Sequence, residues 1–206
     1  TFFTVYGNMV QRGGLKAGDT VLIHGGSSGI GTTAIQMAKE LGAAKVIVTV
    51  GTAEKANACL ELGADHALIY RDTAWEDTVL TLTDGKGVDV ILDMVAGDYV
   101  ARGQKCLAVD GRLVIIAVQG GTDANFHAAM AMVKRQTFTG STLRPQSIEA
   151  KDALAMGLNE HVWPLLNNGT IKPVIHATFP LEQASDAHAM MAGGAPIGKI
   201  VLTVGD

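Results

Sequence analysis

Cysteine is scarce in this sequence, and so is any grouping of metal-binding side chains. Cys59 and Cys106 are the only cysteines among 206 residues, and each lies in an apolar stretch with helical periodicity. Two such thiols predict buried, reduced side chains rather than a disulfide framework. The six histidines are scattered, and no pair has a metal-ligand spacing supported by cysteines or carboxylates. We therefore expect no metal site.

Strong net charge and long apolar runs are also missing. The formal net charge is −4, which gives no reason to expect nucleic acid or an anionic membrane as a partner. No uninterrupted apolar run is long enough to span a bilayer, and no secretory signal begins the chain. We expect a cytoplasmic protein. Because the chain begins at Thr1 and not at a methionine, we also expect a piece of a longer protein.

Apolar residues and glycine are abundant: 48% of the residues are apolar and 25 are glycine. After residue 20, runs rich in Val, Ile and Leu alternate with helical stretches, and glycines mark the junctions. Near-continuous apolar strands predict a sheet covered on both faces. We therefore expect an α/β fold of the Rossmann type, with a doubly wound parallel sheet of six strands. The expected strands are residues 20–24, 45–50, 67–70, 88–94, 112–118 and 137–140. The expected helices are residues 31–41, 53–62, 73–83, 99–108 and 128–134.

The pattern changes after Arg144-Pro145. The tail beyond this point has no place in the six-stranded sheet, and its last strand needs a partner, because an exposed apolar edge invites aggregation. We therefore expect a dinucleotide-binding domain over residues 1–170, with a leading interdomain helix, and a segment over residues 171–206 that returns to a second domain. The elements expected in the tail are a long helix over 147–167, an extended segment at 173–176, a short helix over 181–191 and a strand over 199–204.

A glycine-rich turn, GGSSGIG at residues 25–31, joins the first strand to the first helix of the series. Glycine is cheap where the backbone must bend tightly or approach another group closely. The free N–H groups and the positive dipole end at a helix N-terminus attract an anion. In this place the turn favours a dinucleotide pyrophosphate held by Gly26, Ser28, Gly29 and Gly31, with glycines kept for packing alone as the alternative. No Lys-Ser/Thr pair follows the glycines, so the turn is not a P-loop for ATP.

The end of the second strand bears on which dinucleotide is expected. Enzymes that use NAD usually have an acid there, which accepts hydrogen bonds from the adenosine ribose. Here the sequence is Val50-Gly51-Thr52-Ala53-Glu54-Lys55, with no acid at the tip. Gly51 leaves room, Thr52 offers a hydroxyl and Lys55 offers a cation to a 2′-phosphate, although an ordinary solvated lysine is the alternative for Lys55. We expect Glu54 to point outward and the cofactor to be NADPH rather than NADH.

The same glycine-rich turn would suit a short-chain dehydrogenase, whose catalytic step needs a tyrosine four residues before a lysine. None of the three tyrosines, Tyr6, Tyr70 and Tyr99, has a lysine four residues later. That class is therefore excluded by its own chemistry.

Seven segments along the whole chain carry a more specific resemblance: TFFTVYGNMV, GDTVLIHGGSSGIGTTAIQMAK, VTVGTAEKANACLELGADHALIYR, GVDVILDMVAGDYV, DGRLVIIAVQGG, TFTGSTLRP and IGKIVLTV. In this order they resemble the quinone oxidoreductase branch of the medium-chain dehydrogenases/reductases, which is zeta-crystallin-like and includes the p53-inducible type. The resemblance implies a zinc-independent, NADPH-dependent reductase of quinones or of α,β-unsaturated carbonyls such as enals and enones, acting as a homodimer. It also implies a GroES-like catalytic domain before Thr1, where the catalytic residues are expected.

Two other functions stay open. Enoyl-thioester reductases, including modules of polyketide and fatty-acid synthases, belong to the same superfamily. A nucleotide-sensing or structural protein that binds NADPH without catalysis is the other, because fold alone does not determine activity.

The resemblance assigns roles to residues of the turn and of the second and third strands. It places Ser28 and Gly29 at the pyrophosphate, and Gly51, Lys55 and Tyr70 around the adenosine 2′-phosphate.

The resemblance places the nicotinamide end of the cofactor near Thr4 and near the loops at 117–119 and 142–144. It also implies that Lys199 contacts the cofactor. The complete set of expected cofactor contacts is Thr4, Gly26, Ser28, Gly29, Ile30, Gly31, Gly51, Thr52, Lys55, Tyr70, Val118, Gln119, Leu143, Arg144 and Lys199.

Overall fold

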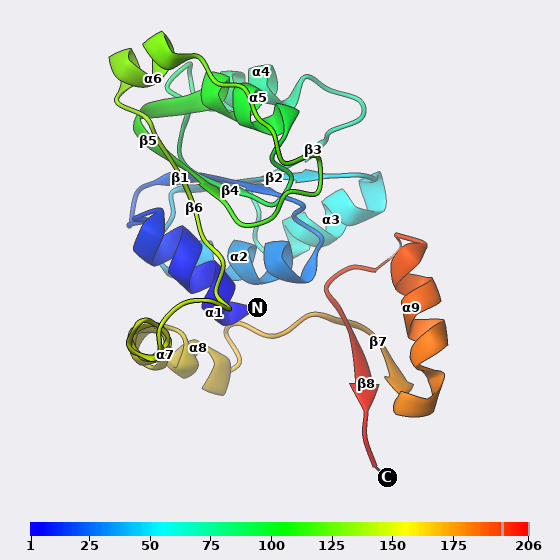
Figure 1. Ribbon diagram of the computed structural model, residues 1–206. Helices are drawn as coiled ribbons and strands as arrows, with labels where there is room; N and C mark the ends of the chain where they lie inside the picture. The colour runs from blue at the N-terminus through cyan, green and yellow to red at the C-terminus, as the bar shows by residue number, and fades with distance from the viewer. Residues whose placement is uncertain (195, 206) are drawn as a thin grey trace.

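The computed structural model describes residues 1–194 and 196–205. Its centre is a sheet of six parallel strands in the order β3-β2-β1-β4-β5-β6 (Figure 1). The strand order reverses between β1 and β4, which is the switch point of a doubly wound fold. The Rossmann-type α/β fold predicted from the sequence is therefore confirmed. The strands are β1 (Thr20–His24), β2 (Lys45–Val50), β3 (His66–Ile69), β4 (Val88–Asp93), β5 (Leu107–Ile115) and β6 (Thr137–Gly140).

Helices cover both faces of this sheet (Figure 1). One face carries α1 (Phe2–Val5), the π-helix η1 (Tyr6–Arg12), α2 (Gly29–Glu40) and α3 (Ala53–Glu61). The other face carries α4 (Trp75–Leu82), α5 (Asp98–Cys106) and α6 (Ala128–Lys134).

The strands divide their side chains between two apolar cores. On β1, Ile23 packs on the side of α2, and Leu22 packs on the side of α4. On β2, Val48 and Ile47 divide in the same way, and all four side chains are fully buried. Successive strand side chains point to opposite faces, so unbroken runs of Val, Ile and Leu are what a sheet with two cores requires.

Two departures from the expected strand bounds affect the predicted site residues. β5 begins at Leu107, five residues early, because Asp110 adopts a φ of +59° inside the strand and the register against β4 is irregular there. A residue in this conformation forms a bulge without ending the strand. β5 then ends at Ile115, which leaves Val118 in an exposed loop. β3 ends at Ile69, so Tyr70 lies just beyond the strand and not within it.

The single long helix expected over residues 147–167 is two helices, α7 (Ile148–His161) and α8 (Trp163–Asn167). Val162 lies between them, with a φ of −119° and a ψ of −40°. Pro164 explains the break, because proline has no N–H to donate to the carbonyl four residues earlier and its ring clashes with that carbonyl. The prediction of one continuous helix is wrong.

The tail forms a small sheet of its own. β7 (Ile175–Pro180) pairs in parallel with β8 (Lys199–Thr203), and the 3₁₀ helix η2 (Leu181–Gln183) and α9 (Ala184–Ala192) connect them. Figure 1 shows these elements beside the main body and outside the six-stranded sheet. The partner that the last strand needs is therefore β7, which extends beyond the segment expected at 173–176. The assignment of residues 171–206 to a second domain stays a prediction.

Candidate functional site

The glycine-rich turn leaves two amides of α2 without an acceptor. Ser28 is the N-cap of α2, and its Oγ accepts a hydrogen bond from the Gly31 N–H at 3.0 Å. The Ser28 N–H donates to the Gly25 carbonyl at 2.9 Å. Within the described residues, the N–H groups of Gly29 and Ile30 find no acceptor, as is usual for the first turn of a helix. These two donors lie at the positive end of the helix dipole and are available to an anion.

Two other glycines of the turn are required by packing. A Cβ on Gly26 would lie 2.7 Å from the Cβ of Val48 and 3.2 Å from the sulfur of Cys59. A Cβ on Gly31 would collide with the carbonyl groups of Gly25 and Gly26. Packing alone therefore explains the glycine at these two positions, which was the alternative interpretation of the turn.

A cavity of about 670 Å³ opens over this turn, at the carboxyl ends of β1, β2 and β4. Open α/β sheets bind their ligands in this place, outside the switch point of the strand order. No carboxylate is among the described residues that line the cavity. The lining residues are Gly25, Ser27, Ser28, Gly29, Ile30, Thr49, Val50, Gly51, Lys55, Tyr70, Met94, Val95, Tyr99, Gln119, Gly120, Met191, Gly194, Pro196, Gly198 and Lys199.

Lys55 reaches the cavity from the first turn of α3, just after β2. Its Nζ donates a hydrogen bond to the Gly194 carbonyl of the tail at 2.6 Å. A Cβ on Gly51 would lie 3.2 Å from the Tyr70 hydroxyl, so the glycine leaves the space that this ring occupies. The Oγ1 of Thr52 accepts from the Lys55 N–H at 3.3 Å and caps α3. Thr52 lies outside the lining, and its hydroxyl is used by the helix.

The tail closes the other end of the cavity. The Gly198 N–H donates to the Ser27 carbonyl at 2.8 Å, which anchors the start of β8 beside the turn. The Lys199 side chain crosses Gly29, because a Cβ on Gly29 would lie 2.6 Å from Cδ and 2.7 Å from Nζ of this lysine. The Lys199 ammonium group therefore lies beside the N-terminus of α2. Together with Lys55, it makes the cavity suited to an anion with two separate negative groups.

Three of the remaining expected contacts lie in other hollows. Thr4 and Leu143 line a hollow of about 510 Å³ between η1, β6 and α7. Val118 lines an apolar groove of about 570 Å³ at the ends of β5 and β6. Arg144 lines neither, and its carbonyl accepts from the Lys151 Nζ at 3.0 Å. The main cavity brings together Ser28, Gly29, Ile30, Gly51, Lys55, Tyr70, Gln119 and Lys199, whereas Thr4, Gly26, Gly31, Thr52, Val118, Leu143 and Arg144 are outside its lining.

Several lining residues were not expected from the sequence. Tyr99 lies in the first turn of α5 and faces the cavity together with Tyr70. Met191 and Pro196 come from the tail, more than 90 residues further along the chain. One feature of a doubly wound sheet could have indicated Tyr99. The helices that follow β1 and β4 begin at the same edge of the sheet, on either side of the switch point, so the first turn of α5 borders the cavity.

Neither cysteine is a reactive group. Burial raises the pKa of Cys59 to about 12 and the pKa of Cys106 to about 12, so both thiols stay protonated at neutral pH. In residues 1–194 and 196–205, no three His, Cys, Asp or Glu side chains are grouped so that they could hold a metal ion. In the same part of the chain, no helix has the length and hydropathy that a membrane crossing requires.

Residues 29–158 match the family described as zinc-binding dehydrogenase. The chain belongs to this family. Human quinone oxidoreductase is 30% identical to it over 202 residues, which cover 98% of this chain and 59% of that protein. A highly reducing polyketide synthase of Cordyceps militaris is 37% identical over 207 residues, which cover 98% of this chain and 8% of that protein. The chain thus spans only a part of each of these relatives.

Solved structures of the superfamily superimpose well on the chain. Escherichia coli quinone oxidoreductase complexed with NADPH has a TM-score of 0.85 and 30% identity, covering 98% of this chain and 62% of that one. An NAD-dependent alcohol dehydrogenase has a TM-score of 0.83 and 31% identity, covering 99% of this chain and 56% of that one. The chain is therefore a nicotinamide-dinucleotide-binding portion of a medium-chain dehydrogenase/reductase.

The packing role of Gly26 is testable by one added methyl group. Gly26→Ala should lower the free energy of unfolding by about 1–3 kcal/mol, because the methyl overlaps Val48. Urea denaturation followed by circular dichroism measures the change. Gly193→Ala is the control, because its added Cβ meets nothing closer than 3.5 Å, and it should shift stability by less than about 0.5 kcal/mol. Equal stability of both variants would show that the turn does not require glycine at residue 26.

Proposed function

We propose that this chain is the cofactor-binding part of an NADPH-dependent reductase of quinones or related α,β-unsaturated carbonyls. The cavity over the glycine-rich turn supports this most directly. It offers the free amides of Gly29 and Ile30, borders on the lysines Lys55 and Lys199, and contains no carboxylate among its described lining residues. NADPH carries negative charge on its pyrophosphate and on its 2′-phosphate, so the charges of cavity and cofactor are complementary.

The lining residues fit NADPH group by group. Gly29, Ile30 and Lys199 would hold the pyrophosphate at the N-terminus of α2. Lys55 and Tyr70 would hold the 2′-phosphate at the end of β2. An ammonium group has three donors, so Lys55 can keep its bond to the Gly194 carbonyl while it binds a phosphate oxygen.

The chain contributes orientation and the exclusion of water to the reaction. When bound, NADPH supplies a hydride from its nicotinamide C4, which reduces an electron-poor carbon or a quinone carbonyl. Val118 lines the apolar groove and the next residue, Gln119, lines the main cavity, so the two hollows adjoin. The groove offers Ile115 and Phe138 to a flat ring and would keep water from it.

The proposal includes a second domain that carries the catalytic residues. Residues 171–206 would belong to it, because Ile175 and Leu181 of the tail are 47% and 48% exposed and need a cover. Human quinone oxidoreductase extends well beyond the portion that this chain matches. We also propose a cytoplasmic, zinc-independent homodimer, with the exposed Met132 and Val133 of α6 as apolar surface for a second subunit.

Reduction of an enoyl thioester is the second candidate, supported by the 37% identity to a polyketide synthase. Steady-state rates with an enoyl-CoA and with a quinone, measured on the protein that carries this chain, distinguish the two. Faster turnover of the enoyl-CoA would favour the second candidate. Tight NADPH binding without turnover of either substrate would favour a protein that binds the cofactor without catalysis.

Lys55→Met tests the choice of NADPH. Loss of a charged hydrogen bond to the 2′-phosphate should raise the Kd for NADPH about 10- to 100-fold and leave the Kd for NADH within about twofold. Titration of the cofactor fluorescence measures both. Lys86→Met, at an exposed lysine outside the cavity lining, should change neither value. Equal affinity of the wild type for both cofactors would contradict the assignment of Lys55.

Lys199→Met tests whether Lys199 binds the pyrophosphate or the 2′-phosphate. Both cofactors have the pyrophosphate, so this substitution should raise the Kd for NADPH and the Kd for NADH by the same factor, about tenfold. The same titration measures it. A loss confined to NADPH would place Lys199 at the 2′-phosphate instead.

A further inference from the structure

Three flat side chains pack together directly beside the cavity, on the α4 side of the sheet. His24 ends β1, Trp75 begins α4 and Tyr99 lies in the first turn of α5. The ring centroids of His24 lie 4.7 Å from Trp75 and 4.8 Å from Tyr99, and those of Trp75 and Tyr99 are 5.1 Å apart. Trp75 is fully buried, whereas Tyr99 is half-buried and lines the cavity. The cluster therefore presents one aromatic ring to the ligand space.

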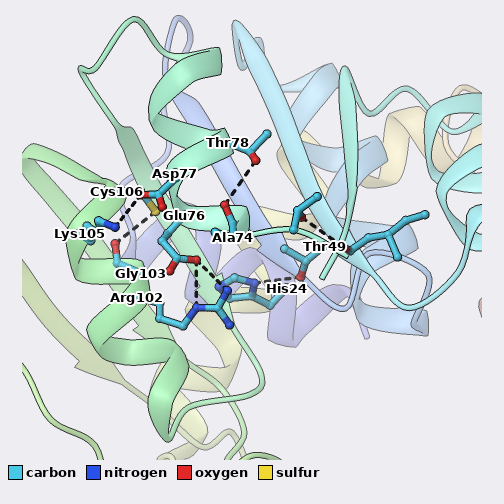
Figure 2. Close-up of polar contacts among 12 residues, drawn as sticks. His24, Thr49, Ala74, Glu76, Asp77, Thr78, Arg102, Gly103, Lys105 and Cys106 are labelled. Atoms are coloured by element: carbon cyan, nitrogen blue, oxygen red, sulfur yellow. Dashed lines mark hydrogen bonds and ion pairs between the residues drawn. The ribbon is translucent and has the colours of Figure 1, made fainter. Parts of the chain in front are cut away.

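The guanidinium group of Arg102 packs against the rings of Trp75 and Tyr99. The Cζ of Arg102 lies 4.6 Å from the Trp75 ring centroid and 5.3 Å from that of Tyr99. Its Nε and Nη2 donate to Oε2 of Glu76 at 3.0 and 2.7 Å. Figure 2 shows the two charged groups of Arg102 and Glu76 pointing toward one another beside His24. Although burial alone would raise the pKa of Glu76, the bonds from Arg102 lower it, so the carboxylate stays ionised.

The imidazole inside the cluster is neutral and incompletely bonded. His24 Nδ1 is 3.0 Å from Thr49 Oγ1 (Figure 2), and no partner for His24 Nε2 lies within the described residues. Burial, and then the charge of Arg102, lower the pKa of His24 to about 3. A buried polar atom without a partner disfavours folding and needs an explanation. We explain it by the position of the His24 ring, which packs against Tyr99 and supports the aromatic surface that faces the cavity.

We propose that Tyr99 is the wall of the cavity on which the adenine ring stacks, and that Arg102, held by Glu76, is the positioning residue that keeps Tyr99 in place. This rests on the proposed function, because it assigns the adenosine half of NADPH to the end of the cavity with Lys55 and Tyr70. A base stacks on an aromatic face without needing a specific hydrogen bond. Arg102 lies three residues after Tyr99 on α5, so both point to the same side of the helix.

The test uses adenosine 2′,5′-bisphosphate, which has the adenosine half of NADPH and no nicotinamide. Binding to the full chain is measured by calorimetry, and thermal denaturation verifies that each variant is folded. Tyr99→Leu removes the aromatic face but keeps apolar volume, and should weaken both adenosine 2′,5′-bisphosphate and NADPH about tenfold. Tyr99→Phe keeps the ring and should bind both within about twofold of the wild type.

Arg102→Met tests the positioning role and has a matched control. Lys105 pairs with Asp77 at 2.5 Å across the same two helices (Figure 2), whereas the cation that lies over the rings of Trp75 and Tyr99 is Arg102. Arg102→Met should weaken adenosine 2′,5′-bisphosphate about threefold or more, whereas Lys105→Met should leave it unchanged. In a Trp163→Phe background Trp75 is the only tryptophan. Its emission should shift on binding of the bisphosphate, and in Arg102→Met the midpoint of that shift should move to a bisphosphate concentration about threefold or more higher.

The outcomes separate this inference from the proposed function. If the wild type binds neither NADPH nor adenosine 2′,5′-bisphosphate, both are overturned. If it binds both and folded Tyr99→Leu binds as well as Tyr99→Phe, the role of Tyr99 is overturned while the NADPH site stands. If Arg102→Met affects binding no more than Lys105→Met does, the positioning role of Arg102 is overturned.

Discussion

The crowded backbone of the glycine-rich turn is the constraint on which the main cavity depends. Gly26 lies against Val48, and Gly31 lies against the carbonyl groups of the turn itself, so neither position has space for a side chain. Ser28 uses its hydroxyl to cap α2 by accepting from the Gly31 N–H. With these groups engaged, the helix begins at Gly29, and the first two amides of α2 are left as the donors that face the cavity. The two free amides, which we propose as donors to a pyrophosphate, thus result from how tightly the strand must turn into the helix.

The tail completes a site that the sheet begins. The bond from the Gly198 N–H to the Ser27 carbonyl brings Lys199 across Gly29, where the sheet alone supplies no cation. At the other end, the Gly194 carbonyl accepts from Lys55. The tail is therefore joined to the main body at both ends of the cavity, beside the two groups assigned to phosphate. These contacts involve residues of the cavity lining, so a ligand bound there as proposed would contact both the main body and the tail.

The aromatic cluster beside the cavity shows how a charged group can order apolar rings. The guanidinium of Arg102 lies over Trp75 and Tyr99 while Glu76 satisfies two of its donors. Without the Glu76 carboxylate, the Arg102 side chain would more readily leave the two rings and be solvated by water. His24 is neutral chiefly because burial lowers the pKa of its imidazole, and the nearby charge of Arg102 lowers that pKa further. The ring surface at Tyr99 is therefore a product of three elements that meet only in the folded chain.

The sequence alone determined the fold class, the six strands and the place of the turn, because strand-and-helix periodicity and glycine spacing are local properties of the chain. It also singled out Ser28, Gly29, Lys55 and Tyr70, which line one cavity. Local reasoning failed where a distant neighbour or a subtle backbone state decides the outcome. The positive φ of Asp110 within β5 is such a place. The break before Pro164 is different, because it follows from the proline itself, a local signal that the predicted single helix ignored.

Only the tertiary structure decided which residues complete the cavity. Nothing in the sequence near Tyr99 indicates that its ring packs on His24 and Trp75, since those contacts join residues that are 75 and 24 positions away. Nothing near Lys199 indicates that its ammonium crosses Gly29, because that contact depends on how the tail returns to the turn. Periodicity and spacing act over a few residues, whereas a site at the switch point of a parallel sheet is assembled from the ends of strands that the chain visits far apart.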